Sequence, residues 1–65
     1  MWAKIQCNLI NLNHFKEIYR DDNGYCGIGF IGVNGDHNCF IFETREERDH
    51  EFDRLERLLL NERGW

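Results

Sequence analysis

A chain of 65 residues with 8 basic and 12 acidic side chains carries a formal net charge of −4. That length allows one domain and little room for an enclosed pocket, so we expect no enzyme, no catalytic residue and no cofactor. The acidic balance argues against a nucleic-acid partner, which would require a basic patch. No apolar run is long enough to span a bilayer, and the first residues lack a signal-peptide pattern. We therefore expect a cytoplasmic protein with no membrane partner.

The first half of the chain predicts two strands. Residues 2–7 alternate between apolar and polar side chains, which indicates a strand. Residues 8–13 contain three asparagines, which favour turns, so a bend is expected there. Residues 15–20 alternate again and predict the second strand, with a short helical turn over residues 12–17 as the alternative. Residues 21–24 then form a turn.

The centre of the chain predicts a β-hairpin. Apolar runs over residues 25–33 and 37–43 flank Asn34-Gly35, a dipeptide typical of two-residue turns in which both residues have positive φ. Such a turn fixes the register and divides the side chains between two faces. One predicted face contains Ile28, Phe30, Cys39 and Ile41. The other contains Ile31, Phe40 and Phe42, with glycines beneath the two rings. Both faces are then apolar, and one helix can cover only one of them.

The glycines of the first hairpin strand also match a nucleotide-binding pattern. Gly27, Gly29 and Gly32 have the spacing G-x-G-x-x-G. That motif requires a helix to begin within it, whereas here a turn follows the strand at once. We therefore interpret them as strand glycines that leave room for neighbouring side chains.

The cysteine pattern favours a reducing compartment. Cys7, Cys26 and Cys39 make an odd number, so a disulfide framework is not expected. His37 lies close enough to Cys39 to suggest a zinc site, but neither C-x-x-C nor H-x₃-H spacing is present. We predict no metal, and thiols that act as small hydrophobic groups.

The end of the chain predicts a helix over residues 45–62. Thr44 and Glu47 have the spacing of a capping box. The core stripe consists of Phe52, Leu55, Leu58 and Leu59, with the stem of Arg48 at its edge. Residues 1–65 are thus predicted to form a single α+β domain: an antiparallel β-meander of three to four strands packed by one C-terminal α-helix.

Two segments carry a family resemblance. Residues 10–18, INLNHFKEI, and residues 40–49, FIFETREERD, followed by Phe52 and Leu55, resemble small uncharacterised proteins of bacteria and their phages. Those proteins are built as a strand meander with a C-terminal helix. The resemblance implies a bacterial or phage origin, and by analogy an inhibitor of a bacterial host defence protein.

The surplus of apolar side chains predicts the function. We expect a non-enzymatic protein-binding module that acts as a homodimer, because a two-fold interface lets one apolar patch cover itself. The expected interface residues are Phe40, Phe42, Ile31, Leu60, Trp65 and Trp2. The alternative is a small-ligand- or nucleotide-binding protein that sequesters its ligand, with Trp2, Tyr25 or Trp65 stacking on it.

Overall fold

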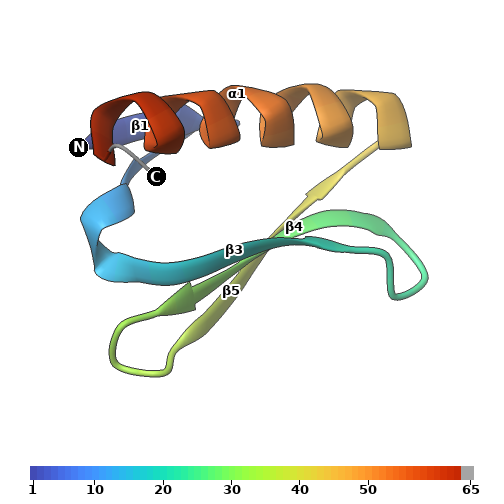
Figure 1. The fold of residues 1–65 in the computed structure, drawn as a ribbon. Helices are drawn as coiled ribbons and strands as arrows, with labels where there is room; N and C mark the ends of the chain where they lie inside the picture. Colours follow the sequence, from blue (N-terminus) through green and yellow to red (C-terminus); the bar gives the residue numbers. More distant parts are fainter. Residues whose placement is uncertain (64–65) are drawn as a thin grey trace.

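The computed structural model describes residues 1–63 and contains two antiparallel sheets and one long helix (Figure 1). In chain order the elements are β1 (Trp2–Ile5), β2 (Asn8–Asn11), the 3-10 helix η1 (Leu12–His14), β3 (Phe15–Asp21), β4 (Cys26–Gly32), β5 (His37–Phe42) and α1 (Arg45–Arg63). β1 pairs with β2, and β3, β4 and β5 pair in that order. The predicted α+β class, the antiparallel strands and the C-terminal helix are confirmed.

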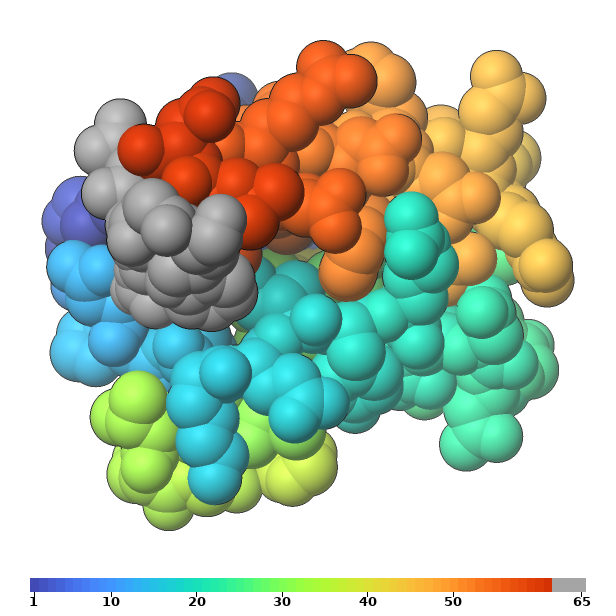
Figure 2. All heavy atoms as spheres, viewed as in Figure 1, coloured from blue at the N-terminus to red at the C-terminus, as the bar shows by residue number. Residues whose placement is uncertain are grey.

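The core lies on one side of the three-stranded sheet. α1 and β1 lie above this sheet in Figure 1, and η1 leads the chain down into β3. Figure 2 shows the side chains of α1 resting directly on those of β3. The buried apolar residues come from both layers: Ala3, Ile5, Leu12, Ile28, Phe30, Leu55 and Leu59. No element among residues 1–63 covers the opposite face of the sheet.

The N-terminal segment forms a hairpin where a bend was expected. β2 pairs along β1, with Ile5 opposite Asn8, so Gln6 and Cys7 make a two-residue turn. Gln6 has a φ of 55°, a conformation that usually signals glycine. Because no glycine marks this turn, the sequence pattern does not reveal it. Cys7 is consequently exposed at the turn and not buried on the strand.

The β4–β5 hairpin has a three-residue loop, and its predicted register is wrong by one residue. The Gly32 N–H donates to the Asp36 carbonyl at 2.7 Å, and the Gly35 N–H donates to the Gly32 carbonyl at 2.9 Å. Gly35 has a φ of 95°, whereas Asn34 does not have positive φ. This is a type I turn followed by a left-handed residue, the usual three-residue hairpin loop. Asn-Gly fits this loop as well as the two-residue turn.

A shift of one residue moves every β5 side chain to the other face. Phe40 lies opposite Ile28, and Phe42 lies opposite Cys26. Both rings are half-buried against the core, and Phe40 meets Phe30 edge-on with ring centroids 5.5 Å apart. The expectation that Phe40 and Phe42 share a face with Ile31 and cover the β4 glycines is therefore wrong.

α1 begins and packs as predicted. The Thr44 hydroxyl oxygen accepts the Glu47 N–H at 3.1 Å, which completes the cap. Leu55 and Leu59 are buried, and Phe52 and Leu58 are partly buried against the core. The stripe predicted from helical periodicity is confirmed, and it holds α1 against the sheet.

Candidate functional site

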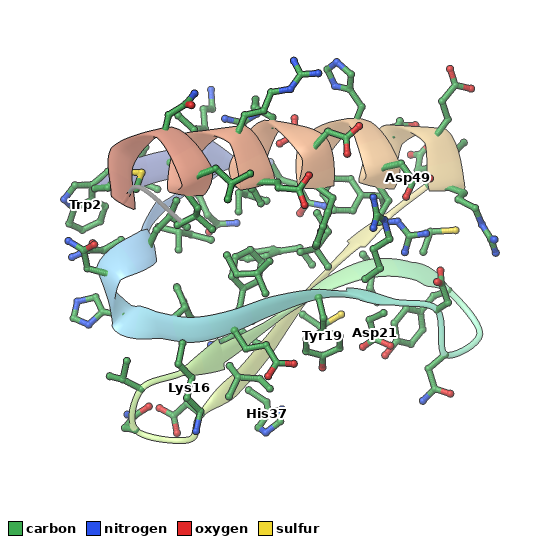
Figure 3. The ribbon with its side chains drawn as sticks, viewed as in Figure 1. Trp2, Lys16, Tyr19, Asp21, His37 and Asp49 are labelled. Carbon is green, nitrogen blue, oxygen red and sulfur yellow. The ribbon has the colours of Figure 1, made fainter. Side chains whose placement is uncertain are left out.

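The sheet face that points away from α1, here called the open face, is the main surface without a covering element among the described residues. Figure 3 shows Tyr19, Asp21 and His37 on this side. The strand register arranges its side chains in three rows across β3, β4 and β5. The rows are Glu17–Ile31–His37, Tyr19–Gly29–Cys39 and Asp21–Gly27–Ile41. The open face thus combines apolar and aromatic groups with charges at its edges.

Two glycines of β4 let neighbouring side chains lie on the strand backbone. A Cβ atom at Gly29 would lie 2.3 Å from Cζ of Tyr19, and one at Gly27 would lie 2.9 Å from Sγ of Cys39. Real Cβ atoms do not approach other atoms so closely. The Tyr19 ring therefore occupies the space that a side chain at Gly29 would need, as in aromatic coverage of strand glycines.

Asp21 accepts from two side chains on the open face. Oη of Tyr25 donates to Oδ2 of Asp21 at 3.1 Å, and Sγ of Cys39 donates to the same oxygen at 3.7 Å. The hydrogen bond to Asp21 raises the pKa of Tyr25, and partial burial is the next cause. Cys39 is exposed as a residue, but partial desolvation of its thiol, followed by the Asp21 charge, raises the pKa of that thiol. Because the thiolate is the nucleophilic form, this environment suits a contact surface better than nucleophilic chemistry.

The outer edge of β5 presents main-chain groups without a strand partner in the described chain. The Gly32 N–H to Asp36 carbonyl bond sets the antiparallel alternation. His37, Cys39 and Ile41 therefore direct their N–H and C=O groups away from β4. Gln6 supplies one partner, since its side-chain amide donates to the Ile41 carbonyl at 2.8 Å.

The two outer edges of the sheet differ in chemistry. β3 is the other edge, and its sequence FKEIYRD contains four charged residues and a register irregularity between Phe15 and Glu17. Charges and bulges of this kind discourage pairing with another strand. β5 reads HNCFIF and has no Lys, Arg, Asp, Glu or Pro. Its paired register with β4 is also regular.

An ion-pair network fixes the β3–β4 turn to α1 on the other side of the sheet. Nη1 of Arg48 lies 2.8 Å from Oδ1 of Asp22 and donates to the Gly27 carbonyl at 3.1 Å. Nε of Arg48 donates to Asp49 at 2.7 Å. Burial alone would lower the pKa of Arg48, but the hydrogen bonds to Asp49 and Asp22 outweigh it and raise the pKa. This network is structural, because the Arg48 side chain is only 2% exposed.

Two of the clefts among residues 1–63 lie between the helix and the strands. An open groove of about 1090 Å³ runs between β1, the end of β5 and the first turns of α1, and Lys4, Glu47 and Arg54 are among its lining residues. A smaller cleft of about 250 Å³ between β3 and α1 is lined largely by apolar residues, including Phe15, Phe52 and Leu59. It falls just below the usual volume of a small-molecule pocket, about 300 Å³ or more.

The predicted interface residues do not come together. Ile31 lies on the open face, whereas Phe40 and Phe42 pack toward the core. Trp2 is 65% exposed on β1, and Leu60 is 42% exposed beside the smaller cleft. Trp65 lies outside the described residues. Sequence reasoning missed Tyr19 and Asp21 on this surface. The alternating Gly27 and Gly29 were the available signal, but the predicted hairpin register assigned their cover to Phe42 and Phe40 and not to Cys39 and Tyr19.

Comparison with models of protein families, with curated proteins and with solved structures finds no match for this chain. Within residues 1–63 the structure contains no helix long and apolar enough to cross a membrane. The same residues contain no cluster of three or more His, Cys, Asp or Glu side chains placed to hold a metal ion. Residues 1–63 thus form a small α+β fold in which no element covers one face of the three-stranded sheet.

Proposed function

We propose that this chain is a non-enzymatic protein-binding module that acts as a homodimer and captures a partner protein on its open face. The observation that carries the proposal is that the open face of the three-stranded sheet has no covering element among residues 1–63. Ile41 on this face is 56% exposed, and Ile31 and Tyr19 are partly exposed. Apolar groups left in water on a sheet favour association with another surface.

The composition of the open face suits a protein partner. Tyrosine offers a large ring and a polar tip, and it is enriched where proteins meet. Here Gly29 lets the Tyr19 ring rest on the sheet, so little side-chain freedom would be lost on binding. Glu17 and Asp21 border the apolar rows, and the whole chain is acidic. The expected partner therefore presents apolar side chains surrounded by basic ones.

The source of the partner rests on the family resemblance alone. Small phage proteins of this build suggest by analogy a bacterial host protein, such as a defence protein, in the cytoplasm. On that basis we propose an inhibitor that works by occupying a surface of its target. The charge and apolar character of the open face are compatible with this role. They support protein binding whether or not the partner is a host defence protein.

The proposal is tested by capture from bacterial lysate with matched variants. Ile31→Lys places a charge on the open face, where Glu17 on β3 lies opposite and can accept it. Val33→Lys makes a similar change at a 63% exposed position in the hairpin loop, outside the open face. The wild-type chain and the Val33 variant should retain the same protein, and the Ile31 variant should lose it. Equal retention by all three chains would refute the open face as the binding surface.

A further inference from the structure

We propose that β5 pairs antiparallel with β5 of a second copy, with the two-fold axis at Asn38. The two three-stranded sheets then join into one sheet of six strands. This inference rests on the proposed homodimer and supplies its geometry. It identifies the occupant of the β5 edge as the same strand of another chain, a form of strand addition in which main-chain hydrogen bonds provide the contact.

The two outer edges of the sheet differ in how well they are protected from pairing with another strand. Unpaired edge strands associate readily unless charges, proline, bulges or a covering element prevent it. β3 has four charged residues and an irregular register, whereas β5 has neither. The pairing of β5 with β4 is regular, so alternate residues of β5 direct their main-chain N–H and C=O groups outward. These residues are His37, Cys39 and Ile41. The sheet thus protects one edge and leaves the other able to pair.

Gln6 selects the register of this pairing. Its amide already donates to the Ile41 carbonyl, and the β1–β2 turn therefore lies beside that end of β5. A partner strand running past Ile41 would collide with this turn. The outward groups of His37 and Cys39 remain accessible. A two-fold axis at Asn38 uses only these, placing His37 of each copy opposite Cys39 of the other with about four main-chain hydrogen bonds.

With the axis at Asn38, β5 of the second copy ends before it reaches Ile41 and the side chain of Gln6. β5 begins at His37, so in this arrangement the residue of the second copy beside Ile41 is the loop residue Gly35. No strand pairing is then required at Ile41, whose carbonyl is already bonded to Gln6. Axes at Cys39 or Phe40 would instead bring His37 or Cys39 of the second copy against Ile41 and Gln6. The obstruction by Gln6 therefore favours Asn38 over both alternatives.

The side chains across the seam are compatible. His37 of one copy lies opposite Cys39 of the other, and the Cys39 thiol itself lies 3.7 Å from the Asp21 carboxylate. A basic imidazole is thereby brought toward an acidic group, and no like charges oppose each other along the paired strands. Because His37, Cys39 and Ile41 all belong to the open face, the pairing joins the two open faces side by side.

Disulfide trapping tests the register. Residues at the axis form a non-hydrogen-bonded pair with Cα atoms about 4.5 Å apart, within the range that a disulfide spans. Asn38→Cys, in a chain also carrying Cys7→Ser, Cys26→Ser and Cys39→Ser, should form a covalent dimer in a glutathione redox buffer. Lys16→Cys in the same background places an exposed thiol on the β3 edge and should stay uncrosslinked. Cross-linking of the Lys16 variant in preference to the Asn38 variant would overturn the proposal.

Proline substitution tests the edge. The Cys39 N–H points away from β4, so Cys39→Pro removes an outward donor and leaves the β4–β5 ladder intact. Light scattering should give twice the 7.9 kDa chain mass for the wild type and the single-chain mass for this variant. If Cys39→Pro does not fold by circular dichroism, His37→Pro at the first strand position makes the same test. A wild-type monomer at all concentrations, or a dimer indifferent to proline, would refute the pairing.

The two proposals fail in different ways. Ile31→Lys lies on the central strand, opposite His37, but its main chain takes no part in the β5 pairing, so the variant should remain dimeric while it loses the captured protein. Unchanged capture by that variant would count against the open face, whereas an unchanged dimer in the proline variants would count against β5 pairing.

Discussion

The side-chain amide of Gln6 donates a 2.8 Å hydrogen bond to the main-chain carbonyl of Ile41, 35 residues further along the chain. Gln6 makes this contact from a turn in which its φ is 55°, a conformation that costs a non-glycine residue free energy. The bond ties the β1–β2 hairpin to the edge of the three-stranded sheet. A side chain is thus retained at a position where glycine would suit the backbone better.

Substitutions at Gln6 separate these two effects. Gln6→Ala keeps the unfavourable φ and loses the hydrogen bond, so it should lower the free energy of unfolding by about 1 kcal/mol. Gln6→Gly loses the same bond but relieves about 1 kcal/mol of backbone strain, so it should be close to neutral. Urea denaturation of the three chains measures both values. Equal stability of the Ala and Gly variants would show that the turn is not strained.

The packing of Tyr19 on Gly29 predicts a coupled pair. Gly29→Ala places a methyl group where the Tyr19 ring now lies, and the ring must swing away. We expect a loss of about 1–2 kcal/mol in the free energy of unfolding. In a Tyr19→Ala background the same glycine substitution should cost much less, since the obstructing ring is absent. A double-mutant cycle measures this coupling, and strictly additive effects would contradict the contact.

Local sequence patterns suffice to predict the elements whose contacts lie within a few residues of one another. Helical periodicity and the Thr44–Glu47 spacing predict α1 and its buried stripe, because both depend on residues only a turn apart. The hairpin around Asn34-Gly35 is also predicted, but its register is not. The same dipeptide serves two-residue and three-residue loops, and the difference of one residue decides which face receives Phe40.

Contacts distant in sequence account for the rest. The β1–β2 turn depends on Gln6 accepting an unfavourable φ, which its bond to Ile41 helps to offset. The covering of Gly29 by Tyr19 depends on the β3–β4 register, which no pattern within one strand specifies. The open face could therefore be expected as a surplus surface, but its residues could not be assigned.

Because the guanidinium of Arg48 is buried, we expect replacement of this residue by methionine to lower the stability of the protein strongly. Arg48→Met keeps the apolar stem and removes the bonds to Asp22, Asp49 and the Gly27 carbonyl. Leaving a buried carbonyl without its donor costs about 1–3 kcal/mol, a large share of the stability of so short a chain. Thermal unfolding should show Arg48→Lys between the wild type and Met, since lysine lacks the planar fork. A fully stable Met variant would mean that the network contributes specificity alone.

The lowered pKa of Asp49 leads us to expect that the protein loses stability in acid. The hydrogen bond from Arg48 lowers the pKa of Asp49; burial opposes it, and a further hydrogen bond from Arg20 supports it. Because the folded-state pKa lies below the ordinary value, the unfolded chain binds the proton first as the pH falls. The contribution of ionised Asp49 to the free energy of unfolding is therefore complete above the ordinary pKa of 3.8. It is lost as the pH falls through the folded pKa. Urea midpoints from pH 7 to pH 2 should fall less steeply for Asp49→Asn than for Glu56→Gln, a matched amide substitution on the same helix.

The environment of Cys39 predicts slow alkylation that depends on Asp21. Burial and the Asp21 charge raise the pKa of the Cys39 thiol, so little thiolate exists near neutral pH. Asp21→Asn removes the charge but keeps the shape of the side chain, and the thiolate fraction of Cys39 should rise a few-fold. Iodoacetamide labelling followed by peptide mass spectrometry measures the rate. Cys7, which is exposed like Cys39 but is not in contact with Asp21, is the internal reference in the same molecule. An unchanged ratio of the Cys39 and Cys7 rates would mean that burial alone controls this thiol. An increased ratio would establish the Asp21–Cys39 contact that links the outer strands of the open face.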